Sequence, residues 1–327
     1  MITVVELATQ LRPLLPIALA IAGGTGALRY RADSTDLVYP TSEVTSFVVG
    51  ARPGGRPKSP LLFVHGCAHG GWVFRGLAQE LSAHGYESHC LTLPKSKFKT
   101  LEQYTADIGG YIAAHVDGGR PVLLGHSQGG VEVQHYLLNE NVDVPPDKRA
   151  AAGVFLASAA GHSLESSVRI VLSLLRLYPL AVLRSIVDSN GAEAVGINNL
   201  EMMKSTMFAP GTTVTTVCGE GEETLEAYAE RLSPVDSILV AGDALKHHRA
   251  GRNKSTPKDL GIPTLTVAAE KDGIIPAFAT DSVAEYWGNE LLTIPGQGHC
   301  FGDAGWESTV VPPLVRWLDA NVAAPQK

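Results

Sequence analysis

Short apolar runs alternate with amphipathic segments along two parts of the chain, residues 43–160 and 258–322. Apolar runs bounded by Gly and Pro predict buried strands, and segments with apolar residues at helical spacing predict helices. The predicted strands cover residues 44–49, 61–64, 86–93, 120–124, 151–157, 262–268 and 291–294. The predicted helices cover residues 72–83, 101–112, 131–138, 276–287 and 312–321. This alternation predicts an α/β protein with a doubly wound, mostly parallel sheet that binds ligands at the carboxyl ends of its strands.

The helix predicted over residues 101–112 has a clear start signal. Thr100 comes directly before its first apolar residue, and Gln103 follows three residues later. A threonine hydroxyl and a glutamine amide at this spacing can each bind a backbone N–H of the other residue. We therefore expect a capping box at this position.

The alternation stops between residues 161 and 257. This stretch contains a long apolar helical piece at 168–187, which we expect to be bent or broken near Pro179, a methionine-rich patch and an acidic run at 220–230. We interpret it as a helical lid inserted after the sixth strand, and we expect the apolar piece to be covered by the rest of the domain. The predicted parts are an N-terminal extension (1–42), a core (43–160 and 258–322), the lid (161–257) and a tail (323–327).

Size and charge limit the function classes. With 327 residues, 45% of them hydrophobic, the chain can bury the core of one catalytic domain plus an insertion. A net charge of −7 gives no basic surface for nucleic acid. Cys67, Cys90, Cys218 and Cys300 lack the spacing of a zinc site or of a dense disulfide framework, so we expect four free thiols, no metal and no cofactor.

The N-terminal stretch leaves the location of the protein open. Residues 13–28 carry no charge, but they are few for a membrane span and contain two prolines. Arg12 followed by an apolar run gives residues 1–22 some character of a signal peptide, although Glu6 weakens the basic leader. We expect a cytoplasmic protein, with secretion or membrane association through residues 13–28 as the alternative. The sequence does not define the oligomeric state.

The strongest motif is Gly-His-Ser-Gln-Gly at residues 125–129, between a predicted strand and a predicted helix. In this context Gly-x-Ser-x-Gly indicates a sharp turn that exposes the hydroxyl of Ser127, called a nucleophile elbow. Side chains at Gly125 and Gly129 would collide with the neighbouring strand and helix. The alternative is a glycine-rich turn that contains a serine by chance.

A second motif, His-Gly-Cys-Ala-His-Gly-Gly-Trp at residues 65–72, follows the predicted strand 61–64. Together the two motifs resemble the α/β-hydrolase superfamily, and within it the branch of plant methyl-esterases, hydroxynitrile lyases and related bacterial esterases. The resemblance covers residues 44–158 and 260–318. It implies a triad in the chain order serine, acid, histidine.

The residues at the triad positions are Ser127, Asp272 and His299. The resemblance implies that the serine takes the acyl group, the histidine moves its proton and the aspartate stabilises the imidazolium. Glu270 is the alternative acid, two residues closer to the predicted strand. The resemblance also implies an oxyanion hole formed by the backbone N–H groups of Cys67 and Gln128.

Other residues could shape a substrate pocket around this site. His65 and His126 flank it and are expected to orient loops by hydrogen bonding rather than to transfer protons. Methionine side chains suit adaptable apolar pockets, so the methionine-rich patch could line the space above Ser127. The full set of pocket candidates is His65, Ala68, His126, Met203, Met207 and Phe208. The sequence indicates no role for Cys300.

The resemblance implies three possible functions. The first is hydrolysis of a carboxylic ester of a small to medium apolar substrate through an acyl-enzyme. The second is a lyase on the same triad, but the lysine that follows the catalytic histidine in hydroxynitrile lyases is here Cys300. The third is a non-catalytic binding or receptor protein. The expected partner is a small-molecule ester.

Overall fold

The computed structural model describes residues 43–53, 58–116 and 120–322. The predicted N-terminal extension, including residues 1–22 and 13–28, and the tail 323–327 lie outside the described residues. The strands of the main sheet are β1 (Thr45–Val49), β2 (Leu61–Val64), β3 (Ser88–Thr92), β4 (Val122–His126), β5 (Ala152–Leu156), β8 (Thr264–Ala269) and β9 (Glu290–Ile294). Each begins and ends within two residues of the bounds of a predicted strand.

The seven strands lie in the order β1-β3-β2-β4-β5-β8-β9. Strand β1 pairs antiparallel with β3, and all other neighbours in the sheet are parallel. The helices that follow these strands are η1 (Gly71–Phe74), α3 (Arg75–Ala83), α4 (Leu101–His115), α5 (Gln128–Asn139), α11 (Pro257–Leu260), α12 (Ala277–Trp287), α13 (Trp306–Thr309) and α14 (Val311–Asn321), with the short turn η2 (Asn141–Asp143). The predicted α/β fold with a mostly parallel sheet is therefore confirmed.

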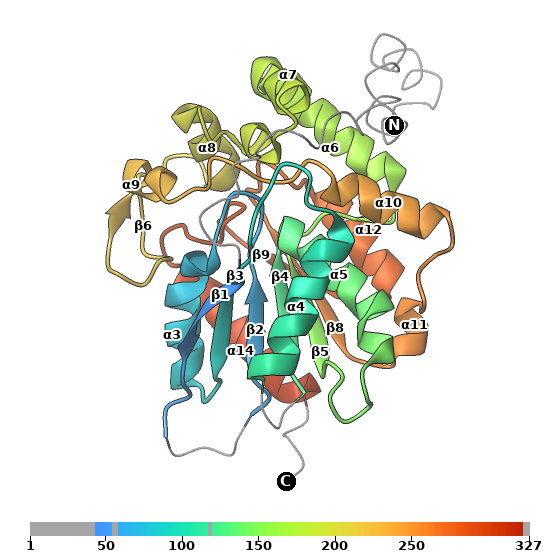
Figure 1. The fold of residues 1–327 in the computed structure, drawn as a ribbon. Helices are drawn as coiled ribbons and strands as arrows, with labels where there is room; N and C mark the ends of the chain where they lie inside the picture. The colour runs from blue at the N-terminus through green and yellow to red at the C-terminus, as the bar shows by residue number, and fades with distance from the viewer. Residues whose placement is uncertain (1–42, 54–57, 117–119, 323–327) are drawn as a thin grey trace. The chain divides into compact units, whose positions relative to one another are not determined.

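Both faces of the sheet are buried, each in its own hydrophobic core. Helices α3 and α14 cover one face, and α4, α5 and α12 cover the other (Figure 1). Side chains alternate along a strand, so Leu61 and Phe63 lie in the first core and Leu62 and Val64 in the second. Burial on two faces explains why these strands read as continuous apolar runs in the sequence.

The expected capping box at the start of α4 is present. The backbone N–H of Gln103 donates to Thr100 Oγ1 over 3.3 Å, and the backbone N–H of Thr100 donates to Gln103 Oε1 over 2.9 Å. These bonds satisfy two backbone donors at the helix end and define where α4 begins.

The inserted segment, residues 161–257, connects β5 to α11. Its elements are α6 (Leu164–Leu177), α7 (Pro179–Val187), η3 (Gly191–Val195), α8 (Leu200–Met207), β6 (Val214–Thr215), β7 (Glu223–Thr224), α9 (Leu225–Glu230) and α10 (Val240–Arg249). It follows the fifth strand that the structure describes, so its expected place after a sixth strand is not confirmed. In Figure 1 most of its helices lie beyond the carboxyl ends of β2 and β4.

The apolar piece expected at 168–187 is broken at Pro179, as its sequence predicts, and forms two helices. Helices α6 and α7 meet at a 120° bend, because Pro179 cannot continue α6 but suits the first turn of α7. The expectation that this piece is covered is wrong for its outer side, where Leu177, Leu180 and Val187 are 62% to 80% exposed. Among the described residues no single helix is long and apolar enough to span a membrane, and only this bent pair reaches the required length and composition when taken together.

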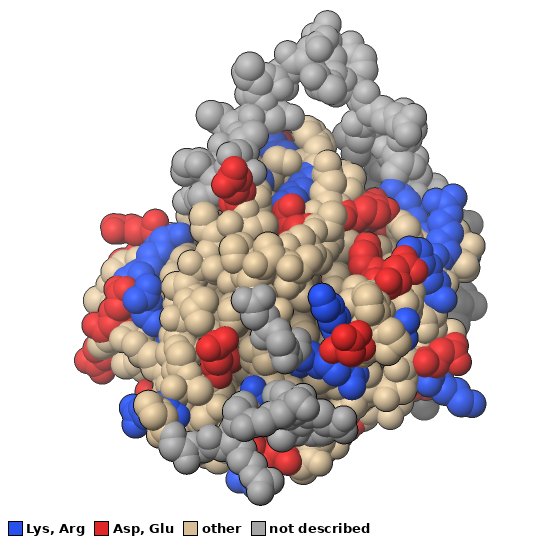
Figure 2. Space-filling model, turned by 60° about the horizontal axis from the view of Figure 1, so that its bottom comes forward, with Lys and Arg blue, Asp and Glu red and all other residues tan. Residues whose placement is uncertain are grey.

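Charged side chains of both signs share the surface. On the face that Figure 2 shows, Lys and Arg side chains lie among Asp and Glu side chains rather than in a separate basic area. This face therefore carries no extended field of one sign.

The contact between β4 and α5 can be tested at Gly125. A Cβ atom there would lie 2.4 Å from the carbonyl oxygen of Gly129, a backbone atom that cannot move aside. We expect Gly125→Ala to destabilise the fold by about 1–3 kcal/mol in urea unfolding. The control is Gly110→Ala in α4, where no atom lies within 4 Å and the helix should gain about 0.5–1 kcal/mol. Equal midpoints for Gly125→Ala and the wild type would contradict this account.

Candidate active site

Ser127 occupies the turn between β4 and α5. Its backbone has φ 54° and ψ −119°, a left-handed conformation that is strained for a residue with a side chain. The turn is held by a hydrogen bond from Ser127 N to Leu156 O (2.9 Å) and one from Gly130 N to Ser127 O (3.0 Å). The sequence motif therefore forms the sharp strand-to-helix turn expected of it.

Glycines let the elements around Ser127 approach closely. A Cβ atom on Gly129 would lie 2.4 Å from the carbonyl oxygens of both Val64 and His65, at the end of β2. A Cβ atom on Gly66 would lie 2.8 Å from the Cβ atom of Ser127 itself. The predicted steric role of Gly129 is thus confirmed, and the loop after β2 lies directly against the serine.

His299 and Asp272 form a buried pair. His299 Nδ1 donates to Asp272 Oδ2 over 2.8 Å, and each side chain is 2% exposed. The second carboxylate oxygen, Oδ1, accepts the backbone N–H groups of Ile274 (2.8 Å) and Ile275 (2.7 Å). Because Nδ1 carries the proton in this arrangement, His299 Nε2 is left as the ring nitrogen that can accept one.

Glu270, the alternative acid, lies elsewhere in the same loop. Its Oε2 accepts the backbone N–H of Gly296 over 2.8 Å, and its Oε1 lies 3.3 Å from Lys271 Nζ. The Gly296 hydrogen bond and the lysine lower the pKa of this exposed carboxyl. Glu270 thus ties two loops together at the surface, while the carboxylate in contact with His299 is that of Asp272.

His126 and His65 hold the loops on either side of the serine. His126 Nε2 donates to the carbonyl oxygen of His299 over 2.9 Å. His65 Nδ1 donates to Gly66 O (2.9 Å), and its Nε2 accepts the backbone N–H of Leu93 (3.0 Å). Burial lowers the pKa of both histidines well below the ordinary value, so both are neutral, as expected of residues that orient loops.

The sequence did not indicate a neutral network behind Cys67. His69 Nδ1 donates to Cys67 O over 2.7 Å, and the hydroxyl of Tyr228 in α9 lies 2.7 Å from His69 Nε2 and 3.4 Å from Cys300 Sγ. Burial lowers the pKa of His69 to about 3 and raises that of Cys300 to about 12. Cys300 is therefore a neutral thiol in contact with the inserted segment.

Cys67 itself is part of the loop rather than a reactive thiol. Burial, reinforced by the negative charge of Asp236, raises the pKa of the Cys67 thiol well above its ordinary value. In the part of the chain that the structure describes, no acceptor is found for the backbone N–H of either Cys67 or Gln128. Both backbone donors are therefore available to a ligand.

A buried cluster of charged residues, which no sequence pattern indicated, lies next to this loop. Lys95 Nζ is 3.6 Å from Asp236 Oδ2, and both side chains are almost fully buried. Glu132, in α5, accepts a hydrogen bond from Gln128 Nε2 over 3.1 Å, while its Oε2 has no partner among the described residues. Burial raises the pKa of Glu132 to about 8, so this carboxyl is protonated near neutral pH.

The methionine patch is packed into the core. Met203, Met207 and Phe208 are at most 1% exposed. The helix that carries the methionines, α8, contacts both loops described above: Gly273 N donates to Thr206 O (3.2 Å), and Cys300 N donates to Met207 O (2.9 Å). The role of these three side chains in a substrate pocket stays a prediction.

An apolar pocket lies on the α3 and α14 side of His126. Its lining residues are Val73, Phe74, Leu77, His126, Leu156, Val217, Cys300, Phe301, Trp306 and Val310. Of the predicted pocket candidates, His126 is the one that it includes. The pocket therefore adjoins the residues that precede Ser127 and follow His299 in the chain.

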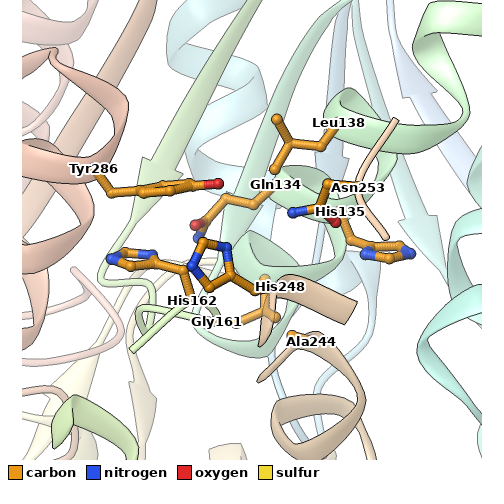
Figure 3. Close-up of a pocket in the computed structure, with 10 residues that line it drawn as sticks. Gln134, His135, Leu138, Gly161, His162, Ala244, His248, Asn253 and Tyr286 are labelled. Atoms are coloured by element: carbon orange, nitrogen blue, oxygen red, sulfur yellow. The ribbon is translucent and has the colours of Figure 1, made fainter. Parts of the chain in front are cut away.

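A second pocket is lined mainly by residues of α5, α10 and α12 (Figure 3). The ring of His162 stacks on that of Tyr286 at 4.0 Å, and His248 meets the same tyrosine edge-on at 5.4 Å. Burial lowers the pKa of His162 to about 4. None of the predicted site residues lines this pocket. In the described ranges no group of three or more His, Cys, Asp or Glu residues could hold a metal ion.

The fold and the site together define a class of protein: a doubly wound α/β protein with a serine on a strained turn and a histidine held by a buried carboxylate. The family model described as "Alpha/beta hydrolase family" matches residues 61–309, well over half of the chain. The chain belongs to this family, and the resemblance drawn from its two motifs is confirmed.

Sequence relatives are plant proteins. The chain is 35% identical over 114 residues to "Probable esterase PIR7A" of Oryza sativa subsp. indica, a match that covers 32% of this chain and 41% of that protein. It is 35% identical over 111 residues to "Esterase PIR7B" of Oryza sativa subsp. japonica, covering 31% of this chain and 39% of the relative. The match thus spans well under half the length of these curated relatives.

Solved structures share the fold over most of the chain. An esterase from Rhodococcus sp. ECU1013, RhEst1, has a TM-score of 0.59 at 17% identity and covers 85% of this chain and 95% of its own. A thermophilic esterase from Thermogutta terrifontis has a TM-score of 0.56 at 18% identity, covering 88% and 99%. At these identities the similarity shows the fold alone.

The raised pKa of Glu132 predicts a pH-dependent stability. The protonated carboxyl stabilises the fold fully below the ordinary pKa of 4.5, and this contribution is lost as the pH rises through about 8. Glu132→Gln keeps the acceptor for Gln128 and cannot ionise. We therefore expect the variant to gain stability relative to the wild type from pH 5 to pH 8, measured by urea unfolding at several pH values. A difference that does not change with pH would contradict the raised pKa.

Proposed function

We propose that this protein is a serine-dependent carboxylesterase that cleaves esters of small to medium apolar substrates through an acyl-enzyme. The observation that carries the proposal is the buried hydrogen bond between His299 and Asp272, together with the hydrogen bond that joins His299 O to His126, the residue before the strained turn of Ser127. The names of the rice relatives, "Probable esterase" and "Esterase", support the same reaction class.

The positions of the donors and acceptors support the following reaction. Ser127 Oγ attacks the ester carbonyl carbon while His299 Nε2 takes the hydroxyl proton, and the carboxylate of Asp272 stabilises the imidazolium. The negative charge that develops on the carbonyl oxygen is stabilised by the N–H groups of Cys67 and Gln128. His299 then gives its proton to the leaving alkoxide, and the alcohol departs. Attack by water, with His299 again as base, releases the acid and restores the serine.

A hydroxynitrile-lyase-like reaction fits these residues less well. In that branch, the resemblance implies, a lysine follows the catalytic histidine, where its positive charge helps to hold cyanide. Here Cys300 is a buried thiol whose pKa is raised to about 12, so it supplies no positive charge at that place. A receptor without catalysis would not need the His299–Asp272 pair.

The nucleophile can be identified by covalent labelling. A fluorophosphonate should label Ser127 alone, because this serine has a base and two backbone donors around it. Mass-spectrometric mapping of the labelled peptide measures the site. Ser127→Ala should abolish labelling and hydrolysis of p-nitrophenyl butyrate. The matched control is Ser158→Ala, two residues after β5, which removes another buried serine and should leave labelling intact. Labelling that persists in Ser127→Ala would overturn the assignment.

The two candidate acids can be separated by a pair of isosteric substitutions. Asp272→Asn cannot hold His299 in the required tautomer, so kcat should fall by about four orders of magnitude while the protein stays folded. Glu270→Gln changes an exposed side chain and should leave kcat within about twofold of the wild type. Steady-state kinetics and circular dichroism on both variants measure the outcome. The opposite ranking of the two variants would make Glu270 the acid.

A further inference from the structure

The inserted segment binds both backbone polar groups of one residue in the loop after β2. Ala68 N donates to Asp236 Oδ2 over 2.6 Å, and Ser233 N donates to Ala68 O over 2.7 Å. Ala68 has φ 63°, the left-handed region that costs a residue with a Cβ atom about 1–3 kcal/mol. A conformation of this kind persists only where its surroundings hold it, and here the holding groups come from residues more than 160 positions away.

Asp236 also contacts the residue that follows Ser127. Its Oδ1 accepts the hydroxyl of Tyr104 (2.8 Å) and the backbone N–H of Ser237 (2.7 Å), and lies 3.4 Å from Gln128 Nε2. Cys67 precedes Ala68 in the chain, and Gln128 follows Ser127. One carboxylate therefore binds the neighbour of the first proposed oxyanion donor and the side chain of the residue that provides the second.

Lys95 completes the support of the loop. Its ammonium group donates to the carbonyl oxygen of His69 and lies 3.6 Å from Asp236 Oδ2. Both side chains are almost fully buried, and a buried ion pair of this kind often adds no net stability compared with apolar residues of similar size. A gain in stability therefore does not explain why these two charges are buried here. Their hydrogen bonds to the loop, which hold its geometry, offer an explanation.

We propose that Asp236 is a positioning residue for the oxyanion hole: by binding Ala68 N–H and Gln128 Nε2, it aims the backbone N–H groups of Cys67 and Gln128 at the same point. This inference rests on the proposed esterase function. Oxyanion donors act on the transition state, so their loss lowers kcat far more than it raises KM. Through Asp236, the inserted segment then affects the rate of the chemical step.

The test is Asp236→Asn. An amide offers one acceptor oxygen in place of two, so either Ala68 N–H or Ser237 N–H would face an NH2 group. We expect kcat for p-nitrophenyl butyrate to fall about 10- to 100-fold with KM within about twofold of the wild type. The burst of p-nitrophenol counts active sites, which separates a slower enzyme from a smaller folded fraction. Tyr104→Phe is the matched control, because it removes a partner of Asp236 but leaves the bond to Ala68; its kcat should stay within about threefold.

A second variant avoids an unpaired buried charge. Asp236→Asn combined with Lys95→Met removes both charges together and should fold, as judged by circular dichroism and thermal unfolding. It should show the same loss in kcat. If Asp236→Asn or the double variant folds and keeps kcat within about twofold of the wild type, Asp236 has no positioning role.

Hydrogen exchange separates this inference from the proposed function. Amide exchange at residues 66–69, measured by mass spectrometry without substrate, should become at least about tenfold faster in Asp236→Asn and stay unchanged in Tyr104→Phe. If the wild type hydrolyses no ester while exchange responds in this way, the esterase proposal fails but the support of the loop by Asp236 stands. If the wild type hydrolyses esters and exchange does not respond, the inference about Asp236 fails and the esterase proposal stands.

Discussion

The site depends on how closely backbone can approach backbone around Ser127. Gly125 and Gly129 let β4, α5 and the end of β2 come so near to one another that a single Cβ atom would overlap a carbonyl oxygen. This close packing holds Ser127 in its left-handed conformation and sets Gly66 against it. Because these glycines have no side chains, the proposed nucleophile and one proposed oxyanion donor can lie close together.

The inserted segment is joined to every loop that carries a candidate catalytic group. Asp236 binds the loop after β2, Thr206 accepts a hydrogen bond from the Asp272 loop, and Met207 accepts one from Cys300, next to His299. A Cβ atom on Gly273 or Gly298 would lie within 2.6 Å of the backbone of this segment. Residues around α8 and Asp236 are thus in direct contact with the loops of the site. The apolar outer side of α6 and α7, by contrast, is exposed.

Local patterns predicted the sheet, the cap at Thr100 and the turn at Ser127, because each is encoded within a few neighbouring residues. The break near Pro179 was expected from the proline itself, but the exposed outer side of α6 and α7 was not, since periodicity alone does not say what a helix packs against. Asp236 and Lys95 could not be predicted at all. Each looks like an ordinary loop residue in the sequence, because the hydrogen bonds and the ion pair that distinguish it are made with residues far away in the chain.

The bond between Ala68 and Asp236 also bears on how the protein folds. It closes a loop of 168 residues, and such a closure is costly in chain entropy until the intervening elements have formed. The sheet around β2 and β4 can assemble earlier from nearer contacts. The final shape of residues 66–69 is therefore one of the last features to form, so during refolding regular secondary structure will return before a competent site does.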